Sequence, residues 1–443
     1  MVTRFSLCRI GLFLPLITSL TFLVACETTR GVFAGNTWCE TGQRTGHDVV
    51  YTGDGAATAR LCWDRDVAEC RLRDAIRSAN LCTVEQTLHL AVAATYSVEY
   101  SDPRSTGDWL YTGLPTIERT LTILGNGATI ERRSLDGFRL LHVANTGVLT
   151  LRNLTVSNGN QFDAGGAILN EGQLSLDTVS LTNNRGAIGG AVMNVGTLTA
   201  QAVQFRLNQA DEQGGALYTE GHARISNSLV DGNRAQSGGG IYLDGGQTEI
   251  YQSAISNNRA EESGGALEYS GALTSRVPLV SIVSSTIAAN AAVFGGAAYF
   301  QGSGLIRLTD VTIAANTILT PSWASPDVLR AAGINARFTG SGLSISVENT
   351  IVSNAGPGAD CLFTPSGGFS RATGLDSDST CSGLTTGSAS LGPLQLNGGG
   401  TTPTMVPAPY SDAIDSGSSC QPTDQNGTRR PIRACDVGAV EVP

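Results

Sequence analysis

The chain has 443 residues, of which 54 are glycines and only 15% are charged, and its formal net charge is −10. That length exceeds what a single compact core usually organises, whereas a solenoid with small end domains reaches it readily. All 28 basic residues are arginines, so a lysine base or Schiff base is excluded, and an acidic chain without a basic cluster is not expected to bind nucleic acid.

The N-terminus predicts an exported protein. Arg4 and Arg9 precede an apolar run over residues 10–24, which ends in small residues. A basic start, a short apolar stretch and small residues before a cleavage point are typical of a secretory signal. The run is short for a permanent membrane span. We therefore predict a signal peptide over residues 1–25.

The signal ends in Leu-Val-Ala-Cys, with the cysteine at position 26. This sequence resembles the bacterial lipobox, which implies cleavage before Cys26 and a lipid on that residue. The alternative is an ordinary signal peptide with a chance cysteine. Glu27, where an aspartate would suggest inner-membrane retention, favours the outer membrane. We expect residues 26–50 to be a tether, and the protein to sit in the cell envelope as an outer-membrane lipoprotein or at the cell surface, with the lipid as its contact to the membrane.

Eight further cysteines lie in two clusters of four, one at each end and none in the middle of the chain. They are Cys39, Cys62, Cys70 and Cys82, then Cys361, Cys381, Cys420 and Cys435. An even number of cysteines in an exported chain indicates disulfides. Zinc binding is the alternative, but no pair has Cys-x-x-Cys spacing, so we do not expect a metal there.

Residues 51–120 are expected to form an N-terminal cap. Within them Leu72, Ala75, Ile76 and Ala79 recur at helical spacing, which predicts a short amphipathic helix. The open first turn of a coil exposes strand edges and apolar core, and it has to be covered. We therefore interpret the helix as a cap, with a partner-binding helix as the alternative.

The sequence Cys-Arg-Leu-Arg-Asp-Ala-Ile from position 70 to position 76 resembles the Cys-Ser-Leu-Arg-Glu-Ala-Ile motif near the start of many bacterial surface β-helix proteins. Arg71 and Asp74 replace the serine and glutamate of that motif. The resemblance implies a disulfide between Cys62 and Cys70, which leaves Cys39 to pair with Cys82.

Residues 121–355 contain a repeat of about 25 residues, the period of a solenoid. A Gly-Gly pair followed by a small residue returns six times, first at Gly165 and last at Gly295. An asparagine precedes most of these pairs and continues beyond them: Asn184, Asn208, Asn233, Asn258, Asn290, Asn316 and Asn354. Alternating apolar and polar residues between the markers predict short strands. We expect the asparagines to occupy left-handed turns and to stack as a ladder inside the coil.

These markers resemble the repeats of chlamydial polymorphic outer-membrane proteins and, more broadly, right-handed parallel β-helix proteins. The fold expected is therefore all-β, a right-handed parallel β-helix with a short N-terminal capping helix and a disulfide-stapled C-terminal cap. Such coils serve as adhesins, passenger domains and polysaccharide-cleaving enzymes, so the fold alone does not give the function.

Residues 356–443 carry six short motifs in order, from Leu-Gly-Pro-Leu at 391 to Asp-Val-Gly-Ala-Val at 436. The series resembles the C-terminal domain of bacterial surface proteins called choice-of-anchor Q. We expect the disulfides Cys361–Cys381 and Cys420–Cys435 here. The polar residues Asp415, Asp424, Arg430 and Asp436 are interpreted as a structural network rather than a catalytic group.

Counting from the second glycine of each pair predicts where chemistry would sit. The residues two positions on are apolar and should face the core, while those three and five positions on should face outward. The outward rows contain the candidate binding residues Tyr218, Tyr242, Tyr299, Glu220 and Asp244. Aromatic rings stack on sugars, and carboxylates bind hydroxyls or calcium, which makes calcium a possible cofactor.

The main hypothesis is a non-enzymatic adhesin or display protein that binds a polysaccharide or a surface protein through this lateral face. The alternative is a polysaccharide lyase or glycosidase that uses Glu220, Asp244 and Glu268. A third is a purely structural envelope protein, in which the tyrosines suit a strand surface and the acids keep it soluble.

Overall fold

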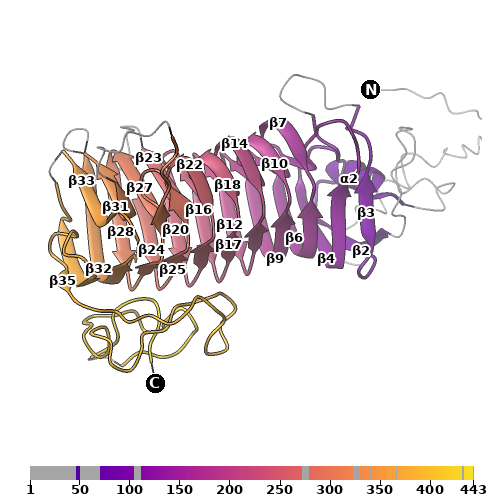
Figure 1. The fold of residues 1–443 in the computed structure, drawn as a ribbon. Helices are drawn as coiled ribbons and strands as arrows, with labels where there is room; N and C mark the ends of the chain where they lie inside the picture. Colours follow the sequence, from indigo (N-terminus) through magenta and orange to yellow (C-terminus); the bar gives the residue numbers. More distant parts are fainter. Residues whose placement is uncertain are drawn as a thin grey trace, which may run out of the picture.

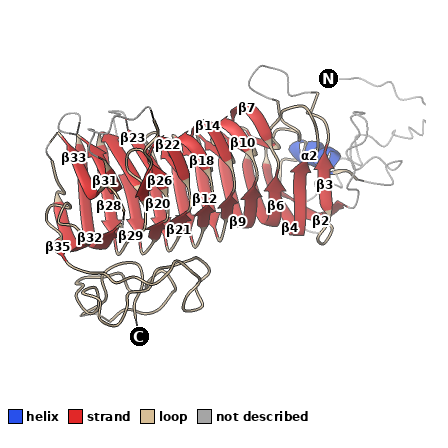
Figure 2. Ribbon diagram, viewed as in Figure 1, coloured by secondary structure: helices blue, strands red, loops and turns tan. Residues whose placement is uncertain are grey.

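A computed structural model describes residues 46–49, 70–103, 111–271, 279–322, 330–338, 342–354, 356–365, 367–431 and 434–442. The described residues form a parallel β-solenoid of successive rungs, and they include one helix near the N-terminal end of the coil (Figures 1 and 2). The fold class expected from the sequence is confirmed.

Strands of successive rungs pair in parallel and build three sheets within the described residues. The nine-stranded sheet consists of β5 (Leu141–Val143), β8 (Ile168–Asn170), β11 (Val192–Asn194), β15 (Leu217–Thr219), β19 (Ile241–Leu243), β23 (Leu267–Gly271), β27 (Ala298–Gly302), β31 (Ala331–Arg337) and β33 (Ala359–Thr364). The seven-stranded sheet consists of β7 (Asn160–Ala164), β10 (Arg185–Ile188), β14 (Gln209–Gln213), β18 (Arg234–Ser237), β22 (Arg259–Ser263), β26 (Ala291–Ala292) and β30 (Thr317–Ile318).

The large sheet is bent at a corner in most rungs, so that two strands of one rung belong to it. Its strands are β1 (Gly46–Val49), β2 (Gln86–Leu90), β3 (Thr95–Val98), β4 (Thr120–Arg132), β6 (Val148–Ser157), β9 (Gln173–Thr182), β12 (Thr197–Gln201), β13 (Gln204–Arg206), β16 (His222–Ser226), β17 (Leu229–Asp231), β20 (Gln247–Tyr251), β21 (Ala254–Ser256), β24 (Leu279–Val283), β25 (Thr286–Ala288), β28 (Gly304–Thr309), β29 (Thr312–Ala314), β32 (Leu343–Ser353), β34 (Arg371–Asp376) and β35 (Thr385–Thr386).

Each glycine pair lies at the corner between the seven-stranded and nine-stranded sheets, and the geometry of this corner requires glycine. Gly189 has φ +61°, in the left-handed region that side chains disfavour. A Cβ on Gly190 would lie 2.1 Å from the carbonyl oxygen of Gly215 on the next rung. The first glycine therefore permits the turn, and the second permits the close approach of stacked backbones.

The marker asparagines form the ladder predicted from the sequence. Asn258 is 1% exposed, and its Nδ2 donates to Asn290 Oδ1 at 3.0 Å and to the Val230 carbonyl at 2.9 Å. Its own Oδ1 accepts from the backbone N–H and the Nδ2 of Asn233. The same pattern runs from Asn184 to Asn354.

Two details of this ladder differ from expectation. The left-handed residue is the one before the marker, for example Asn257 with φ +55°, because the marker asparagine must turn its amide inward. The ladder also ends on a different residue type. Asn354 donates its backbone N–H and its Nδ2 to Oδ1 of Asp360, both at 2.8 Å.

Helix α2 (Leu72–Asn80) covers the N-terminal end of the coil, as expected from the sequence (Figure 2). Its Leu72, Ala75, Ile76 and Ala79 belong to the same continuous core as the coil interior. Strands β2 and β3 already pair in parallel with β4. The parallel sheet therefore begins before residue 121: β2 and β3 lie in the 51–120 segment that the sequence assigned to the cap, and β1, which pairs with β2, lies in the segment assigned to the tether.

The C-terminal segment 387–442 lies along the flank of the later rungs, beneath the orange strands in Figure 1. Its described residues contribute no strand to the three sheets, and they hydrogen-bond to successive rungs through Gln252, Thr286, Asp310 and Thr312. The outward residues of the covered strands are small. Thr286, Ala288, Thr312 and Ala314 are buried, whereas the equivalent Gln204 and Arg206 of an uncovered rung are exposed.

Two disulfides hold this end of the chain. The expected pairs Cys361–Cys381 and Cys420–Cys435 are both confirmed. Cys70 and Cys82 are also in disulfide form, and the partners predicted for them, Cys62 and Cys39, lie outside the described residues. Cys26 and the predicted signal and tether (1–25 and 26–50) fall outside them as well, apart from strand β1.

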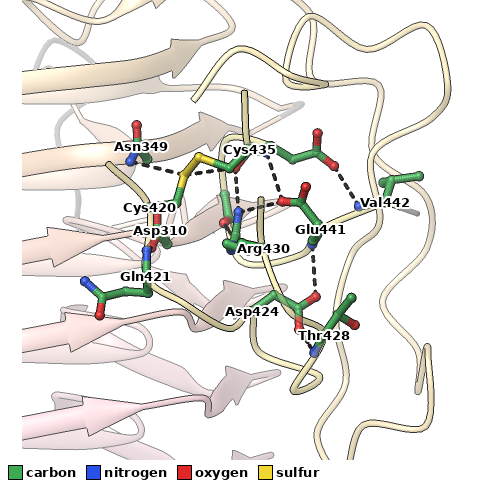
Figure 3. Close-up of polar contacts among 12 residues, drawn as sticks. Asp310, Asn349, Cys420, Gln421, Asp424, Thr428, Arg430, Cys435, Glu441 and Val442 are labelled. Atoms are coloured by element: carbon green, nitrogen blue, oxygen red, sulfur yellow. Dashed lines mark hydrogen bonds and ion pairs between the residues drawn. A yellow bond between two sulfur atoms is a disulfide. The ribbon is translucent and has the colours of Figure 1, made fainter. Parts of the chain in front are cut away.

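The polar residues of this tail form a structural network, which Figure 3 shows in detail. Asp424, Arg430 and Asp436 are 0%, 4% and 1% exposed. Arg430 Nη1 donates to the Asp436 carbonyl at 2.6 Å and pairs with Glu441 at 3.2 Å. Asp424 and Asp436 accept backbone N–H groups of Thr428, Glu441 and Val442. Asp415 is exposed and contributes its backbone N–H to Asp436.

Candidate functional site

The outer face of the nine-stranded sheet carries the residues predicted to form the site. The register stacks Met193, Tyr218, Tyr242, Glu268 and Tyr299 in one row. The inward row is buried as expected, from Ile168 to Ala298. The outward row differs from expectation, because Tyr218, Tyr242 and Glu268 are only 5%, 6% and 3% exposed.

Stacking along the coil explains this burial. The rings of Tyr218 and Tyr242 are parallel to within 8°, with centroids 5.4 Å apart. Rungs separated by about 4.8 Å place identical side chains in van der Waals contact. Each ring therefore covers its neighbour, even though both rings lie on the outer face.

The exposed part of this face is a pair of carboxylates held by one phenol. The Tyr218 hydroxyl lies 2.9 Å from Asp244 Oδ2 and 3.3 Å from Glu220 Oε1. Glu220 and Asp244 are both exposed. Burial and the hydrogen bond to Asp244 raise the pKa of Tyr218, so the phenol keeps its proton and donates it to Asp244, with Glu220 as the alternative acceptor.

Glu268 occupies a different environment from those two acids. Ser263 donates its hydroxyl to Glu268 Oε2 at 2.5 Å, and Ser237 lies 3.2 Å from Ser263. Burial raises the pKa of Glu268 to about 7. Burial also raises the pKa of the flanking Tyr242 to about 12. Glu268 is therefore a buried group, part-protonated near neutral pH, and the predicted trio of acids does not form one exposed cluster.

The raised pKa of Glu268 predicts a loss of stability as the pH rises. The unfolded chain releases the proton near pH 4.5, whereas the folded chain holds it until about pH 7. Between these values the folded state binds more protons, so the free energy of unfolding falls with pH, by roughly 3 kcal/mol from this group.

Glu268→Gln is expected to remove this contribution, so that the variant gains stability over the parent chain as the pH rises from 4.5 to 8. Urea unfolding at a series of pH values measures the difference. The exposed Glu212→Gln is the matched control and should follow the parent chain. Parallel pH profiles for the parent and Glu268→Gln would contradict the assignment.

The N-terminal end of the same face holds polar residues that the repeat pattern did not reveal. His142 Nε2 lies 2.9 Å from Glu171 Oε2, and its Nδ1 lies 3.1 Å from the Thr116 hydroxyl. Burial lowers the pKa of His142. Arg139 is fully buried, and burial lowers its pKa to about 10. Both lie before the first glycine pair, where no repeat predicts which side chains align.

The three acids that could hold a metal lie elsewhere. Within the described ranges, Asp360, Asp376 and Asp378 bring carboxylate oxygens within 4.8 Å of one another. Their oxygens accept hydrogen bonds from protein groups, including Asn354, Ser377, the Cys381 N–H and Thr380. Burial raises the pKa of Asp376 to about 6. These bonds explain the cluster as the end of the asparagine ladder, without requiring an ion.

Comparisons with protein-family models, with curated proteins and with solved structures found no match. The fold and the site geometry therefore define the class: a parallel β-solenoid with a disulfide-bonded C-terminal segment. Its disulfides are typical of proteins that mature outside the cytoplasm. In the part of the chain that is described, no helix has the length and apolar character needed to cross a membrane.

Proposed function

We propose that the protein is a cell-envelope lipoprotein, a non-enzymatic adhesin or display protein that binds a glycan or a surface protein through its lateral face. The observation that carries the proposal is the fixed, exposed pair Glu220 and Asp244 over the stacked tyrosines. A rigid array of this kind binds without the entropy loss of ordering its side chains. The lipobox-like start, the Cys-Ser-Leu-Arg-Glu-Ala-Ile-like motif and the choice-of-anchor Q-like tail support the same proposal.

The second candidate, a lyase or glycosidase, has one feature in its favour. The pKa of Glu268, about 7, suits a general acid. A glycosidase, however, needs its two carboxyl groups to act on opposite sides of one bond. Glu220 and Asp244 converge on one phenol, and Glu268 is 3% exposed with its Oε2 engaged by Ser263. This geometry supports binding better than acid–base catalysis.

The test uses the soluble chain from Glu27 to Pro443, which omits the predicted lipidation site, with disulfides formed, on arrays of neutral and acidic polysaccharides and on isolated envelope proteins. Each array is run with and without calcium, and bound protein and newly formed chain ends are recorded together. We expect binding without new chain ends, and a loss of about tenfold or more in affinity on Glu220→Ala or Asp244→Ala.

The control is Glu249→Ala, which removes an exposed glutamate from the large sheet, and it should bind like the parent chain. New chain ends that disappear in the Asp244→Ala protein would establish an enzyme instead. Absence of both signals would favour the purely structural role.

A further inference from the structure

A groove crosses three successive rungs at the corner between the large sheet and the seven-stranded sheet. Its volume is about 580 Å³, within the range of pockets that hold small ligands. The first rung contributes the loop after β4, the second the turn between β6 and β7, and the third the turn between β9 and β10. The lining residues are Arg132, Arg133, Ser134, Leu135, Asn158, Gly159, Asn160, Asn183 and Arg185.

The groove is lined by positively charged residues, whereas the whole chain has a negative net charge. Three arginines and no carboxylate line it, although the chain carries a net charge of −10. A second groove, of about 510 Å³ on the same seven-stranded sheet, has the reverse balance. One arginine, Arg234, lines it beside Asp211, Glu261 and Glu262. The positive groove is thus a local feature and not a property of the sheet.

The arginines of the groove are held in different ways. Arg132 is held by backbone carbonyls. Its Nε donates to the Asn158 carbonyl and its Nη1 to the Asp136 carbonyl, both at 2.8 Å. Its guanidinium also lies 5.7 Å from the centroid of the Phe138 ring. Arg185 pairs with Asp211 at 2.7 Å. The exposed Arg133 has no ion pair with any described residue, so its charge is available to a ligand.

An exposed aromatic ring lies at the side of the groove. Phe162 is 82% exposed and shares the outward face of β7 with the lining residue Asn160, two positions earlier. The ring packs against Gly137, where a Cβ would lie 2.7 Å from its Cε2. Leu135 on the opposite loop is also fully exposed. Phe162 therefore offers an exposed ring face beside the arginines of the groove, and arginines are enriched among the residues that dominate binding energy.

We propose that this groove binds an acidic saccharide, an oligosaccharide that carries carboxylate or sulfate groups. Arg133 would pair with those anionic groups, because a guanidinium matches a carboxylate or a sulfate with parallel N–H donors. Arg132 would add its Nη2, since its Nε and Nη1 donate to backbone carbonyls. Phe162 would stack on the face of a sugar ring. The amides of Asn158, Asn160 and Asn183 offer donors and acceptors to hydroxyl groups.

The direction of the groove favours an extended ligand. Its lining residues follow the coil axis over three rungs spaced by about 4.8 Å, so a linear chain of sugars would cross the strands. A nucleic acid is disfavoured by long-range repulsion from an acidic protein. The site shares no residue with the Glu220–Asp244 face, so this inference stands apart from the proposed function.

The experiment titrates the soluble, oxidised chain from Glu27 to Pro443 with trigalacturonate, with a sulfated heparin disaccharide, with neutral maltotriose and with a hexaglutamate peptide, by calorimetry at two salt concentrations. We expect an acidic saccharide to bind, maltotriose not to bind, and affinity to fall as salt rises. The two acidic probes distinguish carboxylate from sulfate recognition.

Arg133→Ala and Phe162→Ala should each weaken binding of the acidic saccharide by about tenfold or more. The control Arg224→Ala removes an exposed arginine of the large sheet, which pairs with Glu249, and should leave binding unchanged. Glu220→Ala should also leave it unchanged, which separates this site from the lateral face. Absence of binding, equal losses in the Arg224 variant, or tighter binding of hexaglutamate would overturn the proposal.

Discussion

Replacement of Asn258 by alanine is expected to lower the free energy of unfolding by about 3–5 kcal/mol. The substitution removes two donated hydrogen bonds, to Asn290 and Val230, and the acceptor for two N–H groups of Asn233. Each buried polar group left without a partner costs about 1–3 kcal/mol. Urea unfolding followed by circular dichroism would show the shift in midpoint.

The control for Asn258→Ala is a substitution of the preceding residue, Asn257. Asn257 is exposed and has φ +55°, a conformation that glycine adopts without strain. Asn257→Gly should therefore unfold close to the parent chain, although it removes an exposed bond to Asp231. Equal losses in the two variants would show that the turn, and not the ladder, stabilises this corner of the coil.

Replacement of Arg430 by methionine is expected to release the C-terminal segment from the flank of the coil. The Arg430 side chain is 1% exposed and pairs with Glu441, and it also donates to the carbonyls of Asp436 and Gly438. Removing one partner of a buried ion pair costs about 3–5 kcal/mol, because the other charge stays buried. Burial already raises the pKa of Glu441, so protonation would relieve part of this cost at low pH.

The effect should be local, since the described residues of the segment contribute no strand to the sheets. We expect rapid proteolysis and hydrogen exchange within residues 387–442 and an unchanged circular dichroism spectrum of the coil. The adjacent Arg429 is exposed, and Arg429→Met should resist proteolysis like the parent chain. Cooperative unfolding of the whole coil in Arg430→Met would contradict the picture of a separately docked segment.

The coil was predictable because its constraints recur. Each glycine pair forms the same tight corner between two sheets. Each marker asparagine places its side-chain amide inside the coil. The flank that the C-terminal segment covers is less clear in the sequence. Its outward positions change from Gln204 and Arg206 in an uncovered rung to Thr286 and Ala288 in a covered one. Small outward residues do not identify the segment that covers them. The position of the C-terminal segment could therefore be learned only from the structure.

The candidate site was predictable in register but not in exposure. The sequence places Tyr218 beside Tyr242, and counting alternate residues directs both outward. It does not show that two stacked rings bury each other, or that one phenol holds Glu220 and Asp244 together. The groove at Arg133 and Phe162 was missed for another reason. It joins a loop before the first glycine pair to two later turns, so no single period links its residues.

The end of the asparagine ladder bears on aggregation. Every asparagine amide in it donates toward the next rung, and the last acceptor is Asp360. A carboxyl group in place of an amide offers no N–H group to donate, and the second oxygen of Asp360 already accepts from Ser377. A further copy of the chain stacked on this end would therefore meet an acceptor where the ladder requires a donor. Open ends of parallel coils are templates for fibre growth, and at this corner the change of amide to acid ends the ladder, while β34 and β35 continue the large sheet beyond it.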